Sequence, residues 1–433
     1  MAPRSDAWTR VIIALALCVI ASPATAWGQQ RPQGVTEDAP QGERPPLEAP
    51  PILTGPAPLS SYPLELLGLL GPKRGGVTFT PSIFVSEEYN DNINGDNRDR
   101  RWDFITTVGP ALTLVVNRPT YQLSAGYSSS SKIYARNEEF NEAFGAHNFV
   151  FTSLFQVTPS LTLTASDSFT FEREGTVGGF STGRQDTASN RFDLGMSWRF
   201  SPSNTLSLGG SYNLVRFQGS GGGADSDEYT FRAGLGHTFT SRFDGFIHYK
   251  FDFLDVRGQD DSMTHTPTVG FSYRLTPTLF SSVEGGPAIT QLSNETFVTP
   301  VGSAGLTKIF TFGSMGINYT RDVSVAGGFG GPTVTQIFSG NASVTTLARG
   351  LVVVLSPAYT TAESVSSSQA NQVDAHSFTV TLGAAYQFSA YAMIFGGYSY
   401  FLQHTGSSSS RRIDVNQNIV RVGLQLGYPF HFD

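Results

Sequence analysis

The sequence predicts an all-β protein, an antiparallel, up-and-down transmembrane β-barrel. Three observations lead to this prediction. Apolar and polar residues alternate along most of the chain, and the side chains of a strand point to opposite faces with period two. Short turns and long polar loops also alternate, as they do in bacterial transmembrane barrels. The composition includes 33 Phe and 16 Tyr with only 15% charged residues, which favours strands over helices.

The N-terminal residues 1–26 are typical of a cleaved secretory signal peptide. Arg4 and Arg10 provide the basic region, an apolar run follows, and a small-residue cleavage motif ends at residue 26. The single cysteine, Cys18, lies inside the apolar run. A lipoprotein is the alternative, but Leu17 is bulky where a lipidation motif has a small residue. After cleavage at residue 26 the mature chain would contain no thiol.

Residues 27–75 form a separate region that is rich in proline. Proline removes backbone donors and favours extended chain, so this region predicts a periplasmic linker without a core of its own. Within it, residues 63–71 contain several leucines and could form a short helix. A plug or a docking segment that uses these leucines is the alternative interpretation.

The barrel itself is predicted over residues 76–433. The first strand begins near Gly76, and strands then recur as hairpins about every 40 residues. We expect about 18 strands, with 16 as the alternative because the boundaries between residues 290 and 348 are poorly marked. An even number places both chain ends at the periplasmic side. The predicted external loops are residues 91–101, 136–143, 172–188, 218–226, 256–262, 291–298, 323–332, 363–372 and 405–412.

The hairpin at residues 229–255 shows most clearly which face is which. Phe231, Tyr249 and Phe251 fall on one face, and polar residues fall on the other. A charge that faces lipid at mid-depth costs roughly 2–4 kcal/mol, so charged strand residues should face the lumen. The predicted lumen-lining residues are Arg191, Asp193, Arg199, Arg232, His248, Lys250, Asp252, Arg274 and Arg421. They indicate a polar lumen, although any wide barrel needs a polar interior.

The last predicted strand resembles the C-terminal assembly signal of bacterial outer-membrane proteins. Gln425, Gly427, Phe430 and Phe432 supply its polar residue, its glycine and its alternating aromatic residues. Asp433 follows the terminal aromatic residue, which departs from that pattern. Pro429 can be accommodated only near a strand end, because it has no N–H for the ladder. The motif predicts recognition by the outer-membrane assembly machinery.

Catalytic and metal-binding motifs are not found in the sequence. None of the seven histidines has a serine two residues later, the arrangement of outer-membrane phospholipases. Zinc-protease, serine-hydrolase and Cys/His spacings are likewise missing. Residues 90–101 start like a calcium loop, but Arg101 stands where the last ligand should be Glu, so we expect a solvated Asn-rich turn. We therefore predict no enzyme activity, no metal and no cofactor, with a hydrolase as the least favoured alternative.

The net charge of −7 offers no basic patch for nucleic acid. The predicted partners are outer-membrane lipid and the assembly machinery, and the predicted location is the cell outer membrane. The lead function is a porin-like channel or accessory conduit. A structural or docking barrel with a plugged lumen is the alternative.

Three motifs add a family resemblance. They are residues 80–83 (Thr-Pro-Ser-Ile), 88–93 (Glu-Tyr-Asn-Asp-Asn-Ile) and 108–112 (Val-Gly-Pro-Ala-Leu). Together they resemble outer-membrane β-barrel proteins of the type 2 porin family, many of which occur with exopolysaccharide and exosortase loci. The resemblance is most specific over about residues 76–165. It implies a role in polysaccharide export, with polysaccharide or periplasmic export components as partners, and it implies no catalytic residues.

Overall fold

A computed structural model describes residues 76–173, 176–177 (backbone only), 179–218, 223–293, 295–326, 328–345, 347–366, 372–407, 409 and 412–432. All of them belong to one of the two units into which the chain divides, Leu53–Asp433. The predicted signal peptide, residues 1–26, and the predicted linker, residues 27–75, lie outside the described residues. No helix in the described part of the chain is long and apolar enough to cross a membrane.

The described strands other than β6 and β7, which pair with each other in a separate sheet, form one closed antiparallel barrel of 18 strands. Each barrel strand pairs with the barrel strands before and after it in the chain, and the ring closes where β20 and β21 pair with β1. β20 and β21 count as one strand, since they are two parts of the last strand separated by Tyr428 and Pro429. The predicted fold class and strand number are confirmed. Pro429 lies in the break between the two parts, where no ladder N–H is required.

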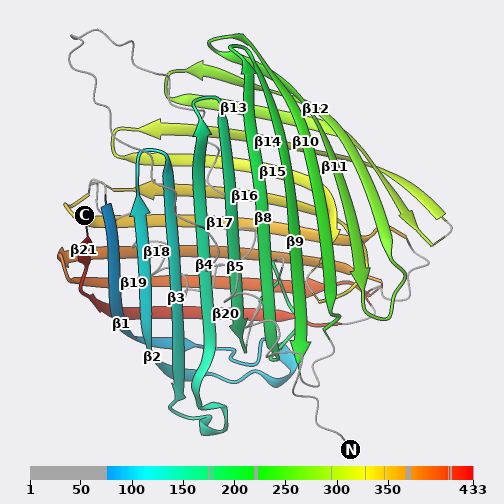
Figure 1. Ribbon diagram of the computed structural model, residues 1–433. Coiled ribbons are helices and arrows are strands. Elements are labelled where there is room, and N and C mark those ends of the chain that lie inside the picture. Colours follow the sequence, from blue (N-terminus) through cyan, green and yellow to red (C-terminus); the bar gives the residue numbers. More distant parts are fainter. Residues whose placement is uncertain are drawn as a thin grey trace, which may run out of the picture. The chain divides into compact units, whose positions relative to one another are not determined.

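The barrel strands, with β20 and β21 taken as one, are long enough to cross a bilayer at a tilt, which takes about 9–11 residues. Figure 1 shows the wall from β3 to β11 running close to vertical and the wall from β15 to β20 running close to horizontal. The strands are β1 (Gly76–Asn90), β2 (Asp103–Asn117), β3 (Tyr121–Tyr134), β4 (Glu142–Thr158), β5 (Leu161–Glu172), β6 (Thr176–Val177), β7 (Phe180–Ser181), β8 (Asp186–Ser201), β9 (Asn204–Gln218), β10 (Ser226–Thr240), β11 (Phe243–Val256), β12 (Ser262–Thr276), β13 (Leu279–Leu292), β14 (Glu295–Phe310), β15 (Gly313–Val325), β16 (Pro332–Val344), β17 (Leu351–Ser364), β18 (Asp374–Ser389), β19 (Ala392–Thr405), β20 (Val415–Gly427) and β21 (Phe430–Phe432). Two short 3-10 helices, η1 (Asn97–Asp99) and η2 (Glu138–Phe140), lie in the first two loops.

The two ends of the barrel differ in their connections. At one end, which we call the turn end, most hairpins close with short turns, and the start of β1 meets the end of β21 there, with Val77 opposite Phe432. At the other end, the loop end, the connections are mostly longer. One predicted loop, residues 291–298, is wrong, because β13 extends to Leu292 and β14 already begins at Glu295. Ser293 has a φ of 54°, a left-handed conformation that makes so tight a turn possible.

Prolines interrupt three of the ladders. Pro110, Pro267 and Pro357 each stand where the register with one neighbouring strand skips residues. Proline has no N–H, so these positions cannot donate across the ladder. The alternating pattern of the sequence predicts prolines mainly at turns. These three prolines lie inside strands, each at a local break in the pairing with one neighbour.

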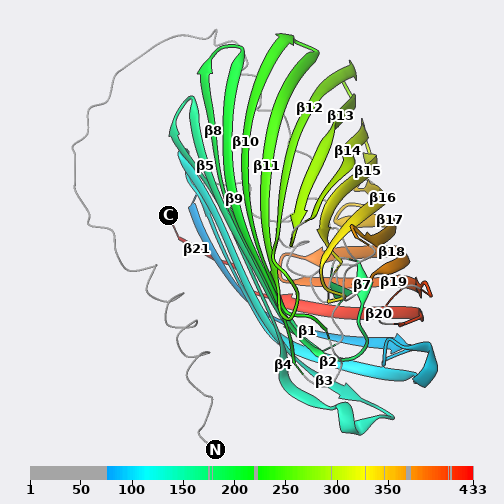
Figure 2. The ribbon, with the colours of Figure 1, turned by 90° about the vertical axis from the view of Figure 1, so that its right-hand side faces the viewer.

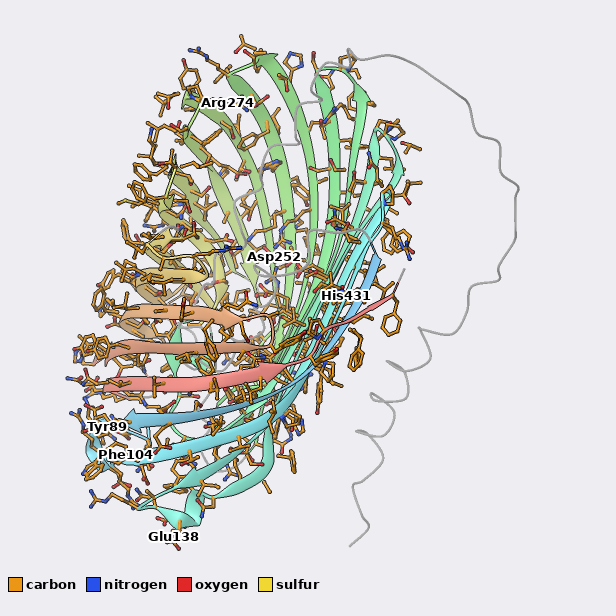
Figure 3. All side chains as sticks on the ribbon, turned by 90° about the vertical axis from the view of Figure 1, so that its left-hand side faces the viewer. Tyr89, Phe104, Glu138, Asp252, Arg274 and His431 are labelled. Atoms are coloured by element: carbon orange, nitrogen blue, oxygen red, sulfur yellow. The ribbon has the colours of Figure 1, made fainter. Side chains whose placement is uncertain are left out.

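The outer face of the barrel carries a belt of exposed apolar and aromatic residues. Ile247, Val269 and Leu194, for example, are 64%, 65% and 52% exposed. Near the loop end Tyr89 and Phe104 lie together with ring centroids 5.4 Å apart, and Figure 3 shows them far from His431 at the turn end. Such a belt is the surface that a barrel presents to lipid.

Candidate functional site: the enclosed face and the crossing segment

Strands β8 to β15 carry charged residues on their inner face. Arg191 and Asp193 on β8 form a two-point ion pair, with Arg191 Nε and Nη2 at 2.9 and 3.0 Å from the Asp193 carboxylate. On β11, Lys250 Nζ lies 3.1 Å from Asp252 and 2.5 Å from Asp322 on β15. Because β15 is four strands away from β11 in the ring, that second contact runs through the interior. The enclosed face of this half is therefore charged.

Two more carboxylates and one histidine extend this charged face. Glu228 on β10 accepts a hydrogen bond from Asn213 on β9 at 3.3 Å. His248 Nδ1 lies 3.0 Å from Glu284 on β13, and Thr268 also donates to Glu284. Ion pairs and hydrogen bonds of this kind offset the cost of placing charges inside a barrel. We call Arg191, Asp193, Glu228, Lys250, Asp252 and Asp322 the mid-wall cluster; it contains two cations and four carboxylates.

The structure brings only some of the predicted lumen residues together. Arg232 stands opposite Lys250 in the register, beside the mid-wall cluster. Arg199 and Arg274 lie near the turn end, and the Arg274 guanidinium sits 5.6 Å from the Phe280 ring centroid. Arg421 is on the other side of the barrel, on β20, where it donates two hydrogen bonds to Glu88 on β1.

Sequence reasoning missed Glu228, Glu284 and Asp322. Glu228 shares its parity with Arg232, but it stands one residue before the alternating run that begins at Tyr229. Asp322 stands one residue before a predicted loop, and no pattern marked Glu284. Parity, extended by one or two residues at each strand end, would have found Glu228 and Asp322.

The inner face from β16 through β20 and β1 to β3 has a different chemistry. It is lined mainly by serine and threonine, which pair with one another, as Thr381 and Ser399 do at 3.3 Å. The Arg421–Glu88 pair is its main charged element, and Lys132 also lies on β3. Buried hydroxyl residues of this half include Ser86, Thr107, Thr113, Ser128, Thr333, Thr335, Thr360, Ser377, Thr379, Thr381, Ser399 and Thr405. We call this the hydroxyl half and the wall from β8 to β15 the charged half. The wall from β8 to β13 carries charged side chains but also buries hydroxyl residues, among them Thr187, Thr264 and Thr290.

A segment between β5 and β8 crosses the interior to the hydroxyl half. We call residues 179–185 the crossing segment; it includes β7. Figure 2 shows β7 beside β18 and β19, and Gly179 reaches Thr360 on β17. Seven strands separate β17 from β5 on one side and eight separate it from β8 on the other. The crossing segment thus reaches the opposite side of the ring.

Phe180 anchors the crossing segment in an apolar cluster. Its side chain is fully buried, and its ring meets that of Phe329 edge-on at a centroid distance of 6.1 Å. Phe329 comes from the β15–β16 loop, so two loops share the cluster. Its remaining members belong to the loops and strand ends around them: Ala326, Ala362, Val373 and Ala375. Burial of a phenylalanine contributes about 1.5–3 kcal/mol.

Gln403 on β19 ties the crossing segment to the wall. Its side-chain oxygen accepts a hydrogen bond from the Ser181 N–H at 2.7 Å, and its amide donates to the Ser181 carbonyl at 2.9 Å. The same amide donates to the Ile413 carbonyl at 3.0 Å. Gln403 is only 1% exposed, so an amide without these partners would carry a desolvation cost. One side chain therefore joins the crossing segment to the β19–β20 loop.

An ion pair also joins the two chain positions that flank the connection between β5 and β8. Arg173 Nε lies 2.7 Å from Asp186, the first residue of β8. This hydrogen bond raises the pKa of Arg173 above its usual value, so the guanidinium stays charged. Two residues before Asp186, the Arg184 N–H donates to the Asn94 carbonyl at 3.1 Å. Contacts therefore fix the crossing segment at Phe180, at Ser181 and next to the start of β8.

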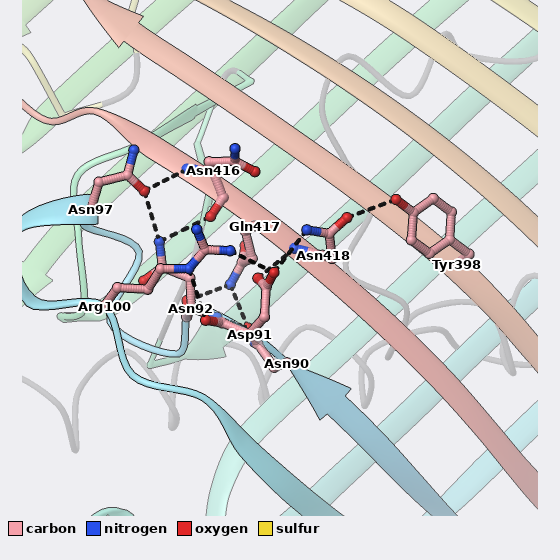
Figure 4. A network of polar contacts seen from close by, with 9 residues as sticks. All are labelled: Asn90, Asp91, Asn92, Asn97, Arg100, Tyr398, Asn416, Gln417 and Asn418. Carbon is pink, nitrogen blue, oxygen red and sulfur yellow. Dashed lines mark hydrogen bonds and ion pairs between the residues drawn. The ribbon is translucent and has the colours of Figure 1, made fainter.

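The β1–β2 loop is held against β20 by a network of amide side chains (Figure 4). Asn92 donates to Asn97 and to the Asn416 carbonyl, both at 3.2 Å. Asp91 accepts from the Asn418 N–H and side chain at 2.7 and 2.8 Å. Asn92 is fully buried, so the predicted solvated turn is wrong at this position. The asparagines form a brace between two strand ends, because their amides replace missing ladder bonds.

Two of the histidines lie beside an aspartate at the loop end. His404 lies 3.1 Å from Asp414, and His376 lies 3.6 Å from Asp374. His147 contacts the Tyr127 hydroxyl at 2.9 Å. In the part of the chain that the structure describes, no three His, Cys, Asp or Glu residues group as metal ligands. The expectations of no enzyme activity, no metal and no cofactor stay predictions.

The residues of the proposed assembly signal lie in the last strand and its extension. Gln425 is buried and donates to the Ser82 hydroxyl at 3.0 Å, and Gly427 stands opposite Ser82. Phe430 and Phe432 are about half exposed, at 45% and 55%, and they pair with β1. Recognition by an assembly machinery stays a prediction.

Comparisons with known proteins add no family. No family model matches the chain, and no curated protein matches it. Among solved structures, the chain is similar to Acinetobacter baumannii OccAB4, with 10% identity, a TM-score of 0.39 and coverage of 83% of this chain and 99% of that chain. It is also similar to Pseudomonas aeruginosa OccK5 (OpdH), with 11% identity, a TM-score of 0.43 and coverage of 82% and 100%.

A third similar structure is the siderophore receptor PirA from Pseudomonas aeruginosa, with 9% identity, a TM-score of 0.39 and coverage of 82% of this chain and 81% of that chain. At these TM-scores the likenesses carry no argument about function. The fold assignment rests on the strand pairing itself. The resemblance to the type 2 porin family stays a prediction.

Proposed function

We propose that the chain is an outer-membrane barrel that acts as a porin-like channel. The observation that carries this proposal is the contrast between the two faces of the closed barrel. Outside, the strands expose residues such as Val269 and Ile247. Inside, Lys250, Asp252 and Asp322 form a charged cluster. Apolar side chains suit lipid, and charged side chains need water, so the arrangement suits a membrane barrel with a wet interior.

The solute path runs along the charged half. The crossing segment packs on the hydroxyl half through Phe180 and Gln403, and it narrows that side of the interior. Side chains of the charged half are more open to solvent, as Arg191 and His248 are 47% and 42% exposed. A solute that passes the crossing segment therefore meets Arg232 and the mid-wall cluster.

Planar-bilayer recording tests this proposal. The full mature chain is compared with a variant in which residues 174–184 are replaced by a short Gly-Ser turn. Glu172 stands opposite Thr187 in the register, so a tight turn can close this hairpin without disturbing the ladder. We expect step-like currents from the mature chain and larger steps from the variant. A barrel that inserts but conducts in neither form would contradict the channel.

A plugged docking barrel is the second candidate. The observation in its favour is that two loops meet inside the barrel, where Phe180 packs against Phe329. In this case the mature chain is silent and the variant without residues 174–184 conducts. A second truncation, which removes residues 27–73, tests the leucine-containing linker as the plug. Current only after that truncation would assign the plug to the linker.

Polysaccharide export is the finer part of the proposal, and it rests on the family resemblance alone. The expected partners are outer-membrane lipid, the assembly machinery and periplasmic export components. Deletion of the gene should reduce surface polysaccharide while the precursor accumulates, and normal polysaccharide levels would contradict export. A hydrolase is tested by replacing His147, His265 and His404 with alanine. Unchanged lipid and protein turnover in that variant would remove the enzyme hypothesis.

A further inference from the structure

A pocket of about 570 Å³ lies at the loop end. Four segments that are distant in sequence form its walls: the β1–β2 loop, the crossing segment, the end of the β19–β20 loop and Phe140 of η2. Its volume falls within the roughly 300–1,000 Å³ of small-molecule sites. Four arginines line it, Arg98, Arg101, Arg184 and Arg412, together with the two carboxylates of Asp96 and Asp99. This is a high density of guanidinium groups for a chain with a net charge of −7.

The walls of the pocket are held in place by contacts outside it. The amide network of Asn92 and Asp91 fixes the first wall to β20. Gln403 joins the second wall to the third through Ser181 and Ile413. A site whose walls are already fixed loses less conformational entropy when a ligand binds.

The arginines differ in how their charge is balanced. Arg101 is paired with Glu139 at 3.1 Å and with Asp99 at 3.4 Å. Arg412 donates to the Ser407 carbonyl at 3.0 Å, which is a neutral acceptor. Among the described residues, neither Arg98 nor Arg412 has a carboxylate partner. Of the two acids nearest to Arg98 in sequence, Asp99 pairs with Arg101, and Asp96 accepts the Arg98 backbone N–H as a helix cap.

Arg184 gives the pocket an oriented cation. Its guanidinium lies 4.0 Å from the centre of the Phe140 ring. It also donates to the Ile93 carbonyl at 3.3 Å and to the Tyr134 hydroxyl at 3.2 Å. Cation–π contact and these bonds hold the planar group in one orientation. A planar, oriented guanidinium is suited to two-point recognition of a carboxylate or a phosphate.

We propose that this pocket binds the oxyanion group of a soluble solute, a carboxylate or a phosphate carried on a sugar-sized molecule. Arg98 and Arg412 supply the charge that the described residues leave unbalanced, and Arg184 orients the anion. The proposal rests on the proposed function only in treating the bound solute as cargo of the channel, because binding itself needs no transport. The expected cargo is therefore an anionic solute that enters from the loop end.

Equilibrium binding to the full mature chain in detergent micelles tests the pocket, with trigalacturonate and glucose 1-phosphate as anionic probes and maltotriose as the neutral probe. The variant R98Q/R412Q removes the two unbalanced charges. The matched control R118Q/R257Q removes two arginines outside the pocket, the half-buried Arg118 and the exposed Arg257, and changes the net charge equally. We expect anion binding to weaken at least about tenfold in R98Q/R412Q, since hydrogen bonds to charged groups contribute about 1.5–3 kcal/mol. The control should bind as the unaltered chain does.

Whichever anionic probe binds more tightly assigns the group as carboxylate or phosphate, and either result supports the site. Equal affinity for maltotriose, or equal loss in both double variants, would overturn it. Competition by lipid A would assign the arginines to membrane lipid and would also overturn a soluble ligand. The variant R98K/R412K keeps both charges and should retain part of the affinity, which controls for misfolding.

Bilayer conductance in KCl separates this proposal from the channel itself. A chain that binds trigalacturonate but never conducts would refute the channel and leave the anion site standing. A chain that conducts but binds no anionic probe would refute the anion site and leave the channel standing.

Discussion

The charged half and the hydroxyl half of the inner wall face each other across one lumen, yet they differ in what they can contact. In the charged half, Lys250 and Arg191 require carboxylates and water around them, so little can pack against them at low cost. In the hydroxyl half, short side chains such as Thr381 and Ser399 hydrogen-bond to one another and are buried. A protein segment can cover that wall with a smaller desolvation cost. This difference explains why the crossing segment docks where it does.

The strongest test of this comparison is Phe180→Ala. Phe180 is fully buried in the cluster that attaches the crossing segment to the hydroxyl half. Truncating a buried phenylalanine costs about 3–5 kcal/mol, so residues 179–185 should detach. We expect faster hydrogen exchange in that segment and larger, noisier currents. Phe144→Ala is the control, since Phe144 is 58% exposed, and equal exchange in both variants would contradict the anchor.

Gln403→Leu tests the polar attachment. It leaves the Ser181 N–H and carbonyl and the Ile413 carbonyl without their partner. Unsatisfied buried groups cost about 1–3 kcal/mol each, and partial relaxation should leave a net loss of roughly 2–3 kcal/mol. Guanidinium unfolding in lipid vesicles measures the loss. Gln403→Glu keeps the shape and the acceptor for the Ser181 N–H but loses the amide donor. Unchanged stability in Gln403→Leu would contradict the polar attachment.

Lys250→Ala tests the charged half. Lys250 stands between Asp252 and Asp322, with 19% of its side chain exposed. Its removal leaves carboxylates without a cation, so we expect the cation-to-anion permeability ratio to rise several-fold and stability to fall by roughly 1–2 kcal/mol. The reversal potential in a KCl gradient measures the ratio. Lys250→Arg should change it little, and an unchanged ratio in the alanine variant would place the ion path elsewhere.

The smallest expected effect is the difference between a matched pair, Thr230→Val and Thr381→Val. The Thr230 hydroxyl donates to Asp252 at 2.8 Å in the charged half, whereas the buried Thr381 hydroxyl pairs with the Ser399 hydroxyl at 3.3 Å in the hydroxyl half. Loss of a hydrogen bond to a charged group costs about 1.5–3 kcal/mol, and loss of a neutral one about 0.5–1.5 kcal/mol. Vesicle unfolding should rank Thr230→Val as the more destabilising change. The reverse order would show that the two halves do not differ as described.

Most of the fold could be predicted from the sequence, because period-two alternation reports directly on the two faces of a strand. The strand number followed from counting hairpins between short turns. The turn after Leu292 could not be distinguished from a loop, since polar residues such as Gln291 continue the ladder there. The breaks in pairing at Pro110, Pro267 and Pro357 could not be predicted either, because each proline interrupts the ladder with only one of its two neighbouring strands.

Of the candidate site, only the charged strand residues could be predicted from the sequence. Arg191 and Lys250 stand out against apolar neighbours, so parity assigns them to a face. Serine and threonine give little contrast with either face, which is why the hydroxyl half went unrecognised. The crossing segment depends on Phe180 and Gln403, and nothing local in their sequences indicates a partner in a distant strand. The arginine pocket likewise joins four remote segments.

The bond between Ser181 and Gln403 has a consequence for assembly, because the two residues are 222 positions apart. The N-terminal strands carry the crossing segment, but the surface that receives it is built from β17 to β19, near the end of the chain. Contacts so distant in sequence form late, since the loop between them must close first. We therefore expect the lumen to be narrowed only as the last strands enter the membrane. Protease protection of residues 179–185 should then appear together with closure of the β1–β20 seam, and protection before that closure would contradict this order. Protease protection of the crossing segment would then mark the point at which the barrel is complete.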